Sequence, residues 1–144
     1  MQITLGLVVV ILAGLCWGGQ VLSWLAPKTA VQWGLKESEA EVEPVFAADL
    51  EAEARWDAVI LWPMIVAGVL LAIDHEAWPY FGLVGAGSYL YFAGRGVAAR
   101  LIMQARGFRI GTPSDITIAL IALTVWGVMA ASVMVAAIVE LEGR

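Results

Sequence analysis

Three acidic residues, Asp49, Glu53 and Asp57, are spaced by four, so on a helix they form one acidic stripe. Two basic residues, Arg95 and Arg100, follow a later apolar stretch, and helical geometry brings them to a similar depth. Such groups can enclose a cavity that binds a polar or anionic head group, with arginine as the fork. They can also pair with one another and fix helix ends without binding anything, which is ordinary for charges in such places. The sequence therefore predicts ion pairs and leaves a binding site open.

Other polar positions indicate less chemistry. Gln20 lies inside an uncharged stretch, where an interhelical hydrogen bond is the default partner for an amide. His75 stands between Asp74 and Glu76, but one histidine without a second cluster of ligands does not make a metal site, so we expect no metal and no cofactor. Cys16 is the single cysteine, and in an apolar helix we expect it to pack as an inert thiol.

Residue sets that identify common enzymes are missing from the sequence. It has no Ser-His-Asp set, no glycine-rich phosphate loop and no paired histidines. We therefore predict no catalytic residue. An enzyme acting on a lipid-like substrate would have to use Glu53 or Asp57 as its acid or base.

Apolar stretches must position these residues. Hydrophobic residues make up 61% of the 144 residues, too many for an ordinary soluble domain. A bilayer core about 30 Å thick is crossed by roughly 20 helical residues, and four stretches approach that length. We predict a single membrane domain, an all-α four-helix bundle, with spans at about 3-25, 56-73, 78-98 and 114-138. The first is expected to be an uncleaved span, because it lacks the basic start and small-residue cleavage site of a signal peptide.

Prolines and capping residues mark the expected helix ends. Pro44 can open a helical extension that precedes the second span, and Pro63 is expected to kink that span. Pro79 suits the first turn of the third helix after a tight hairpin. Residues 112–115 offer a threonine N-cap, a proline and an acid, so the fourth helix is expected to begin there.

Basic residues indicate the orientation. The two predicted loops, 26-55 and 99-113, lie on one side together with the end of the third span, and Arg144 is alone on the other side. The basic residues of the first side are Lys28, Lys36, Arg55, Arg95, Arg100, Arg106 and Arg109. The positive-inside rule assigns that side to the cytoplasm, and acidic residues count little in it. Both termini and the His75 hairpin are therefore expected outside.

Small residues predict how the helices approach one another, since membrane helices associate where backbones come close. Each predicted span carries a pair spaced by four: Gly14 and Gly18, Gly68 and Ala72, Gly82 and Ala86, Gly127 and Ala131. Aromatic residues fit the same frame, with Trp24, Trp56, Tyr89 and Tyr91 expected near the inner interface and Trp78 and Tyr80 near the outer one. The deeper Trp17, Trp62 and Trp126 are expected to pack against lipid or helices.

The predicted loops differ in character. Residues 36–43 alternate charged and small residues, which is typical of solvated chain. Arg106 and Arg109, beside Phe108 and Ile110, suit the anionic head groups of inner-leaflet lipids. Nucleic-acid binding is disfavoured, because the acidic loop shares the same face.

Several of these features together resemble a known family. They are the Trp33-Gly34-Leu35 turn after the first span, Glu53-Ala54-Arg55-Trp56 opening the second, and Phe92-Ala93-Gly94-Arg95 ending the third. This order resembles the small four-helix membrane proteins grouped as DoxX-like. The resemblance implies a four-helix bundle and little about chemistry, and the lack of a cysteine pair argues against a thiol-redox role.

Three classes of function remain open. The first is a non-enzymatic protein of the bacterial inner membrane that packs with lipid or with another membrane subunit, as a homo-oligomer or in a larger complex. The second is a homo-oligomeric transporter or channel with Gln20, Asp57 and Arg95 along its path. The third is a membrane-embedded enzyme. The small-residue pairs and the missing catalytic sets favour the first.

Overall fold

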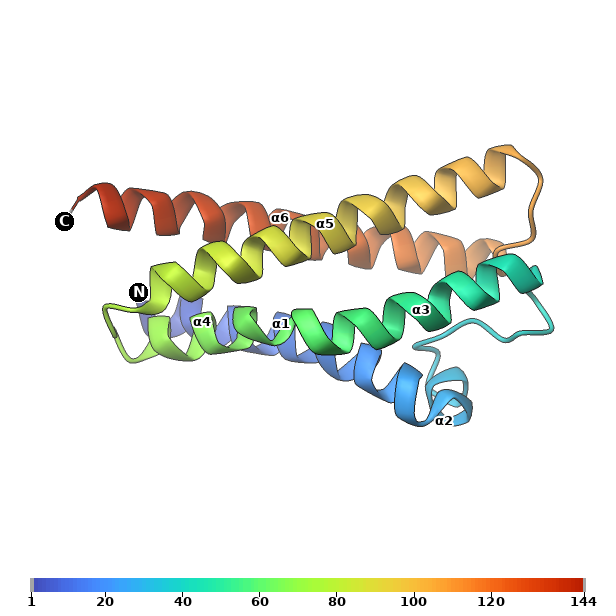
Figure 1. Ribbon diagram of the computed structural model, residues 1–144, viewed down its shortest axis with the longest axis horizontal. Helices are drawn as coiled ribbons and strands as arrows, with labels where there is room; N and C mark the ends of the chain where they lie inside the picture. The colour runs from blue at the N-terminus through green and yellow to red at the C-terminus, as the bar shows by residue number, and fades with distance from the viewer. Residues whose placement is uncertain (1, 144) are drawn as a thin grey trace.

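The computed structural model describes residues 2–143 and is all-helical over that range, without strands. Met1 and Arg144, the basic residue assigned to the outer side, lie outside the described residues. The helices are α1 (Gln2–Leu25), α2 (Pro27–Gln32), α3 (Pro44–Ile60), α4 (Trp62–Ala72), α5 (Trp78–Ala105) and α6 (Pro113–Glu142) (Figure 1).

Three helical segments of the described chain are long and apolar enough to cross a membrane, as expected of a membrane protein. They are α1, the combined segment Pro44–Ala72 formed by α3 and α4, and α6. At 28 residues α5 is as long, but it is rich in glycine and carries Arg95, so it falls outside this group. By length and composition alone, the structure supports three of the four predicted spans.

The predicted helix starts are confirmed. Prolines occupy the first turn of α3, α4, α5 and α6, where their missing N–H leaves no helical bond unmade. At the start of α6 the Asp115 amide donates to Thr112 Oγ1 at 3.2 Å, and the Thr112 amide donates back to Asp115 Oδ2 at 3.1 Å. This reciprocal pair is a capping box. The interruption expected at Pro63 occurs at Leu61, between α3 and α4.

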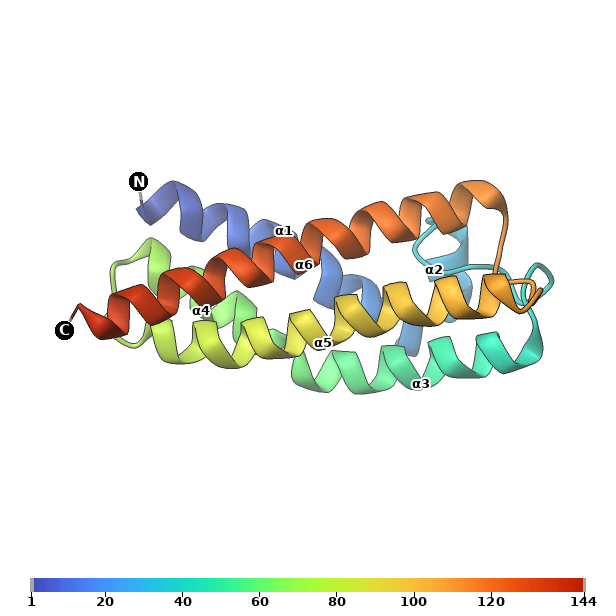
Figure 2. The same cartoon turned by 90° about the horizontal axis from the view of Figure 1, so that it is seen from above.

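The long helices lie side by side (Figures 1 and 2). The termini of the described chain and the α4–α5 turn are at one end, and α2 and the α5–α6 turn are at the other. Helix α6 packs mainly on α5, and α1 packs mainly on α4 and α3. α1 and α6 contact each other only briefly, and Figure 2 shows them crossing and then separating toward the α2 end. The end of the molecule that holds α2 and the α5–α6 turn is called the α2 end.

The closest helix approach in α1 is not where its GxxxG pair predicted it. A Cβ on Gly14 or Gly18 would meet nothing within 4 Å, so no neighbouring helix packs closely at the Cβ position of this pair. A Cβ on Gly6 would instead lie 2.5 Å from the Ala72 nitrogen and 2.6 Å from the Gly68 carbonyl oxygen. The pair in α4 is therefore used as predicted, but its partner is Gly6, because the crossing point lies near the start of α1.

Three aromatic side chains fasten the middle of α1 to its neighbours by hydrogen bonds to backbone carbonyl groups. Tyr89 Oη donates to Ala13 at 2.9 Å, Trp126 Nε1 to Leu12 at 3.0 Å, and Trp17 Nε1 to Ala58 at 2.8 Å. Tyr89 is fully buried. Its hydroxyl group finds a carbonyl acceptor inside the protein, and its place at the inner interface stays a prediction.

The two predicted loops are shorter and more ordered than expected. α5 continues to Ala105, which leaves residues 106–112 as the loop, and residues 27–32 form α2. Val42, Phe46 and Ile110 make a small second core, and an antiparallel bridge joins Val42 to Ile110. The stretch 36–43 was predicted to be solvated, but it folds back because Val42 buries its side chain against the α5–α6 loop.

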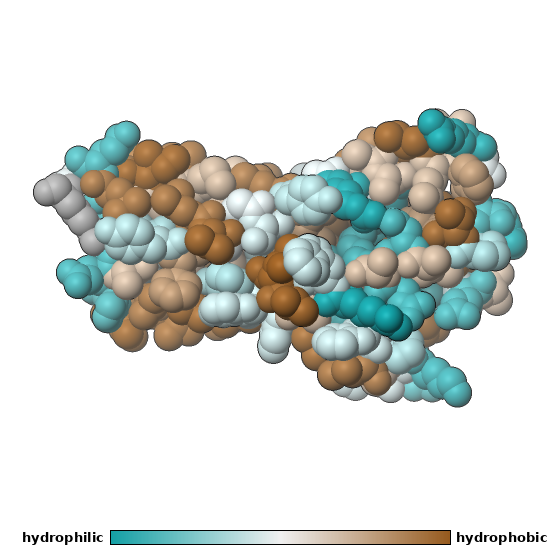
Figure 3. Space-filling view, viewed as in Figure 1, coloured by the Kyte–Doolittle hydropathy of each residue, from teal (hydrophilic) through white to brown (hydrophobic). Residues whose placement is uncertain are grey.

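Hydropathy divides the surface along the length of the molecule. Figure 3 shows that hydrophilic side chains gather over the half that contains α2, the start of α3 and the α5–α6 turn. The other half is mainly hydrophobic except at its tip. The polar half is where the predicted cytoplasmic loops lie.

Candidate functional site

A cavity of about 320 Å³ lies between the C-terminal half of α1 and the N-terminal half of α6. α3 and α5 contribute the wall between them, and segment 31–41 lines the side toward the α2 end. The cavity exists because α1 and α6 separate beyond the point where Trp126 bonds to α1. We call it the α1–α6 cavity.

Along the helices, the lining of the α1–α6 cavity is apolar toward the middle of the molecule and mixed toward the α2 end, where charged side chains stand among Val31, Leu35 and Ile118. The apolar lining includes Leu15, Cys16, Phe92, Leu123 and Trp126. The polar lining includes Gln20, Lys36, Glu37, Glu53, Arg100 and Asp115. Such a division suits an amphiphile, whose chain and head group need different surroundings.

Arg95 makes the ion pairs that the sequence predicted. Its guanidinium group contacts Asp49, and its Nη1 donates to Glu53 Oε2 at 2.5 Å. Two of the three residues of the acidic stripe therefore bind one arginine, and this pairing ties α3 to α5. Arg95 lies outside the lining of the α1–α6 cavity.

Arg100 does not pair with the acidic stripe. Its side chain is buried, with the whole residue 8% exposed. Nη1 donates to the Gly96 carbonyl oxygen at 3.3 Å, and the guanidinium carbon lies 5.5 Å from the centre of the Phe46 ring. Nη2 lies 3.5 Å from Glu37 Oε1, at the limit of a hydrogen bond, and Nε has no partner among residues 2–143. The sequence identified Arg100 but neither Glu37 nor Phe46.

Asp57 separates from the rest of the stripe. It is 3% exposed, and its Oδ2 accepts no hydrogen bond from the described part of the chain. It lies one turn beyond Glu53 and outside the cavity lining. The expected pairing of Asp57 with an arginine was wrong, because Arg95 reaches toward Asp49, in the opposite direction along α3.

The remaining polar candidates are dispersed. Gln20 lines the cavity, and its side chain makes no hydrogen bond with residues 2–143, so the predicted interhelical bond is not found. His75 lies in the α4–α5 turn, where its Nδ1 accepts from the Ala77 amide at 3.1 Å. Cys16 is buried in the core and forms part of the apolar lining.

The two lipid head-group candidates differ. Arg109 Nε donates to Glu43 Oε1 at 3.2 Å, and the Arg109 carbonyl accepts from the Glu43 amide. This arginine therefore joins the α5–α6 loop to the start of α3. Arg106 caps the end of α5 and is exposed. Of these two arginines, Arg106 is the one whose guanidinium group makes no ion pair with residues 2–143.

Several cavity residues could not be identified from local patterns. Glu37 lies in a stretch that resembles solvated chain, and Phe92 and Trp126 look like ordinary helix residues. Glu37 is 63 residues from Arg100 in the chain, so no local signal could have joined them.

Comparison of the chain with protein-family models, with curated proteins and with solved structures finds no match. The DoxX-like resemblance stays a prediction. The function of the protein is therefore inferred from the geometry of this chain alone.

Proposed function

We propose that this protein spans a bacterial inner membrane four times, with both termini outside, and acts without catalysis by holding a lipid-like amphiphile in the α1–α6 cavity. The observation that carries the proposal is that the lining is apolar toward the middle of the molecule and gains charged side chains toward the α2 end. In this proposal the protein works by packing with lipid, alone or within a larger membrane complex.

The position of α5 supports a fourth crossing. It packs along α6 and α4, and its length of about 42 Å exceeds a bilayer core of about 30 Å. A helix in that position cannot stop halfway without exposing backbone to lipid. Its partners α4 and α6 cover Gly82, Gly85 and Gly96, so part of its low hydropathy belongs to the face that is buried within the protein.

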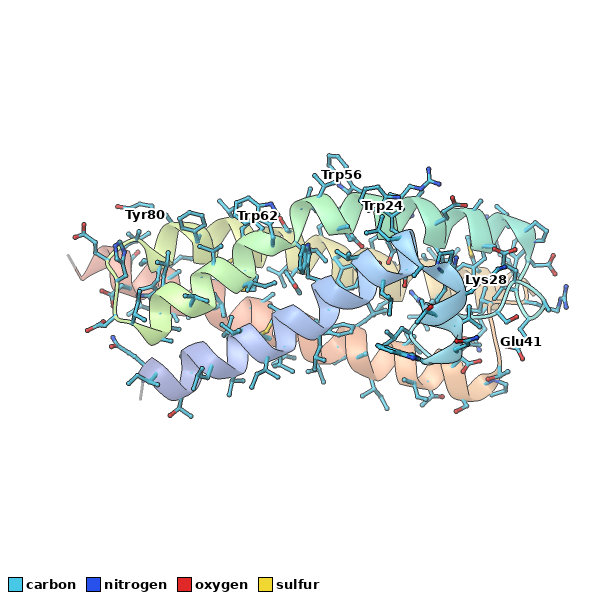
Figure 4. The ribbon with its side chains drawn as sticks, turned by 90° about the horizontal axis from the view of Figure 1, so that it is seen from below. Trp24, Lys28, Glu41, Trp56, Trp62 and Tyr80 are labelled. Atoms are coloured by element: carbon cyan, nitrogen blue, oxygen red, sulfur yellow. The ribbon has the colours of Figure 1, made fainter. Side chains whose placement is uncertain are left out.

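Exposed aromatic side chains indicate how deep the cavity lies in the proposed membrane. In Figure 4, Tyr80, Trp62 and then Trp56 with Trp24 follow one another along one edge of the molecule, and Lys28 and Glu41 lie beyond them. Trp24, Trp56 and Tyr80 are exposed, as side chains in an interfacial belt would be. With Tyr80 at the outer interface and Trp24 at the inner one, the charged lining of the cavity falls at the cytoplasmic head groups.

The cavity chemistry favours binding over the two other classes of function. For transport, Gln20 lines the cavity but Asp57 and Arg95 do not, so the three residues do not share one path. For catalysis, Glu53 is already bound to Arg95, and Asp57 has no access to the cavity.

Native mass spectrometry of the gently extracted protein tests this function. We expect the wild-type protein to retain an amphiphile, and Ala122→Phe to lose it, because Ala122 lines the cavity and a phenyl ring would fill it. Ile121→Phe is the matched control, since Ile121 is the neighbouring residue, is exposed and lies outside the lining. Equal occupancy in Ala122→Phe and wild type would contradict the proposal. A different protein bound in place of an amphiphile would assign the chain to accessory subunits.

A further inference from the structure

Arg100 is an incompletely satisfied cation inside the α1–α6 cavity. Nine-tenths of it is buried, yet Nε has no partner among the described residues and Nη2 has only the long contact with Glu37. A buried donor without an acceptor is costly, and more so when it carries charge. The buried guanidinium group of Arg100 therefore lacks a hydrogen-bond acceptor that a bound ligand would supply.

The orientation of the guanidinium group is already determined. Nη1 is held by the Gly96 carbonyl and the face of the group lies over Phe46, so Nε and Nη2 form the edge left for another partner. Two parallel N–H groups along that edge match two oxygens of a carboxylate or a phosphate. A lysine could not present such a fork.

The acidic residues of the cavity do not all compete for this edge. Glu53 is held by Arg95, and Asp115 Oδ2 accepts from the Thr112 hydroxyl at 2.6 Å and from its amide. Glu41, the fourth acid of the lining, is exposed and makes no ion pair with Arg100 among the described residues. Glu37 is the direct competitor, and it belongs to a coil segment between α2 and α3. Lys36, the next residue, also lines the cavity and adds a positive charge there.

We infer that the α1–α6 cavity takes an anionic amphiphile, whose carboxylate or phosphate oxygens replace Glu37 at Nε and Nη2 of Arg100. This inference rests on the proposed function. The apolar chain lies against Phe92 and Trp126, since Phe92 is about two helical turns from Arg100 along α5, toward the middle of the molecule. A volume of about 320 Å³ is at the low end for ligand cavities and suits a single chain.

The test uses the full chain in a neutral detergent and two probes, a long-chain fatty acid brominated in mid-chain and its methyl ester. Bromine quenches tryptophan fluorescence, and Trp126 lies in the apolar lining, so binding appears as a saturable part of the quenching. We expect the acid to bind about tenfold or more tightly than the ester, as a charge-assisted fork would require. Arg100→Gln should remove that difference and leave ester binding unchanged.

Two further variants sharpen the test. Arg106→Gln is the matched control, because it removes one positive charge from the exposed end of the same helix. It should leave both affinities as they are. Glu37→Gln removes the competitor and should strengthen binding of the acid, which also provides the test if Arg100→Gln does not fold.

The outcomes separate this inference from the proposed function. If acid and ester bind equally and neither Arg100→Gln nor Glu37→Gln changes the acid, anion recognition is overturned while amphiphile binding stands. If neither probe gives a saturable signal, the proposed function fails as well. Displacement of the bound acid by inorganic phosphate would support the anion site and assign it to a free anion, whereas no displacement would assign it to an amphiphile.

Discussion

The contact between Gly6 of α1 and the Gly68 and Ala72 backbone of α4 provides the sharpest test of the packing. We predict that Gly6→Ala destabilises the protein and that Gly14→Ala, the same change in the same helix, does not. At Gly6 the new methyl group would lie 2.5 Å from a backbone nitrogen, where ordinary contact begins at 3.4 Å. At Gly14 it would meet nothing within 4 Å.

The expected magnitude follows from these distances. Both atoms nearest to the new Cβ belong to the backbone of α4, so no side chain can rotate away and the helices must separate by about 1 Å. Such overpacking typically costs about 1–3 kcal/mol. Gly14→Ala should instead stabilise by up to about 1 kcal/mol, because alanine is the better helix former.

Reversible unfolding in mixed micelles, followed by circular dichroism, measures both variants against wild type. The expected result is a lower free energy of unfolding for Gly6→Ala and an equal or higher one for Gly14→Ala. A neutral Gly6→Ala would refute the α1–α4 contact. A Gly14→Ala variant as unstable as Gly6→Ala would show that the GxxxG pair carries a contact after all.

Two more predictions concern stability. A double-mutant cycle between Arg95→Ala and Glu53→Ala should give a coupling free energy of about 0.5–1 kcal/mol, which is modest because the Arg95 side chain is a third exposed. The same cycle between Arg95→Ala and Asp57→Ala should be additive, and coupling only to Asp57 would contradict the ion pairs of Arg95. Thr112→Ala should lower the free energy of unfolding by about 1 kcal/mol through loss of the N-cap, whereas Thr117→Ala, at an exposed threonine one turn further along α6, should change it little. Equal losses in denaturant titrations would show that the N-cap does not stabilise α6.

Helix starts were the most predictable part of the fold, because their signals are local. Pro44 and the capping box of Thr112 and Asp115 act within one helical turn, so no distant residue can move them. The spacing of the acidic stripe was equally local, and it correctly placed Asp49 and Glu53 on one face of α3. Local spacing could not predict which of these acids form an ion pair, since this depends on how α3 is rotated against α5.

The sequence by itself thus determined an all-helical chain of a membrane protein, in which three of the four predicted spans are long and apolar enough to cross a membrane, and it indicated that the loop charges lie toward one end. Only the tertiary structure decided that Arg100 meets Glu37 and Phe46, that Gly6 takes the close approach, and that a cavity opens beside Trp126. The physical reason is that hydropathy and periodicity report on one helix at a time. Crossing points and rotations of packed helices arise from contacts between residues far apart in the chain, and these contacts leave no pattern in either segment alone.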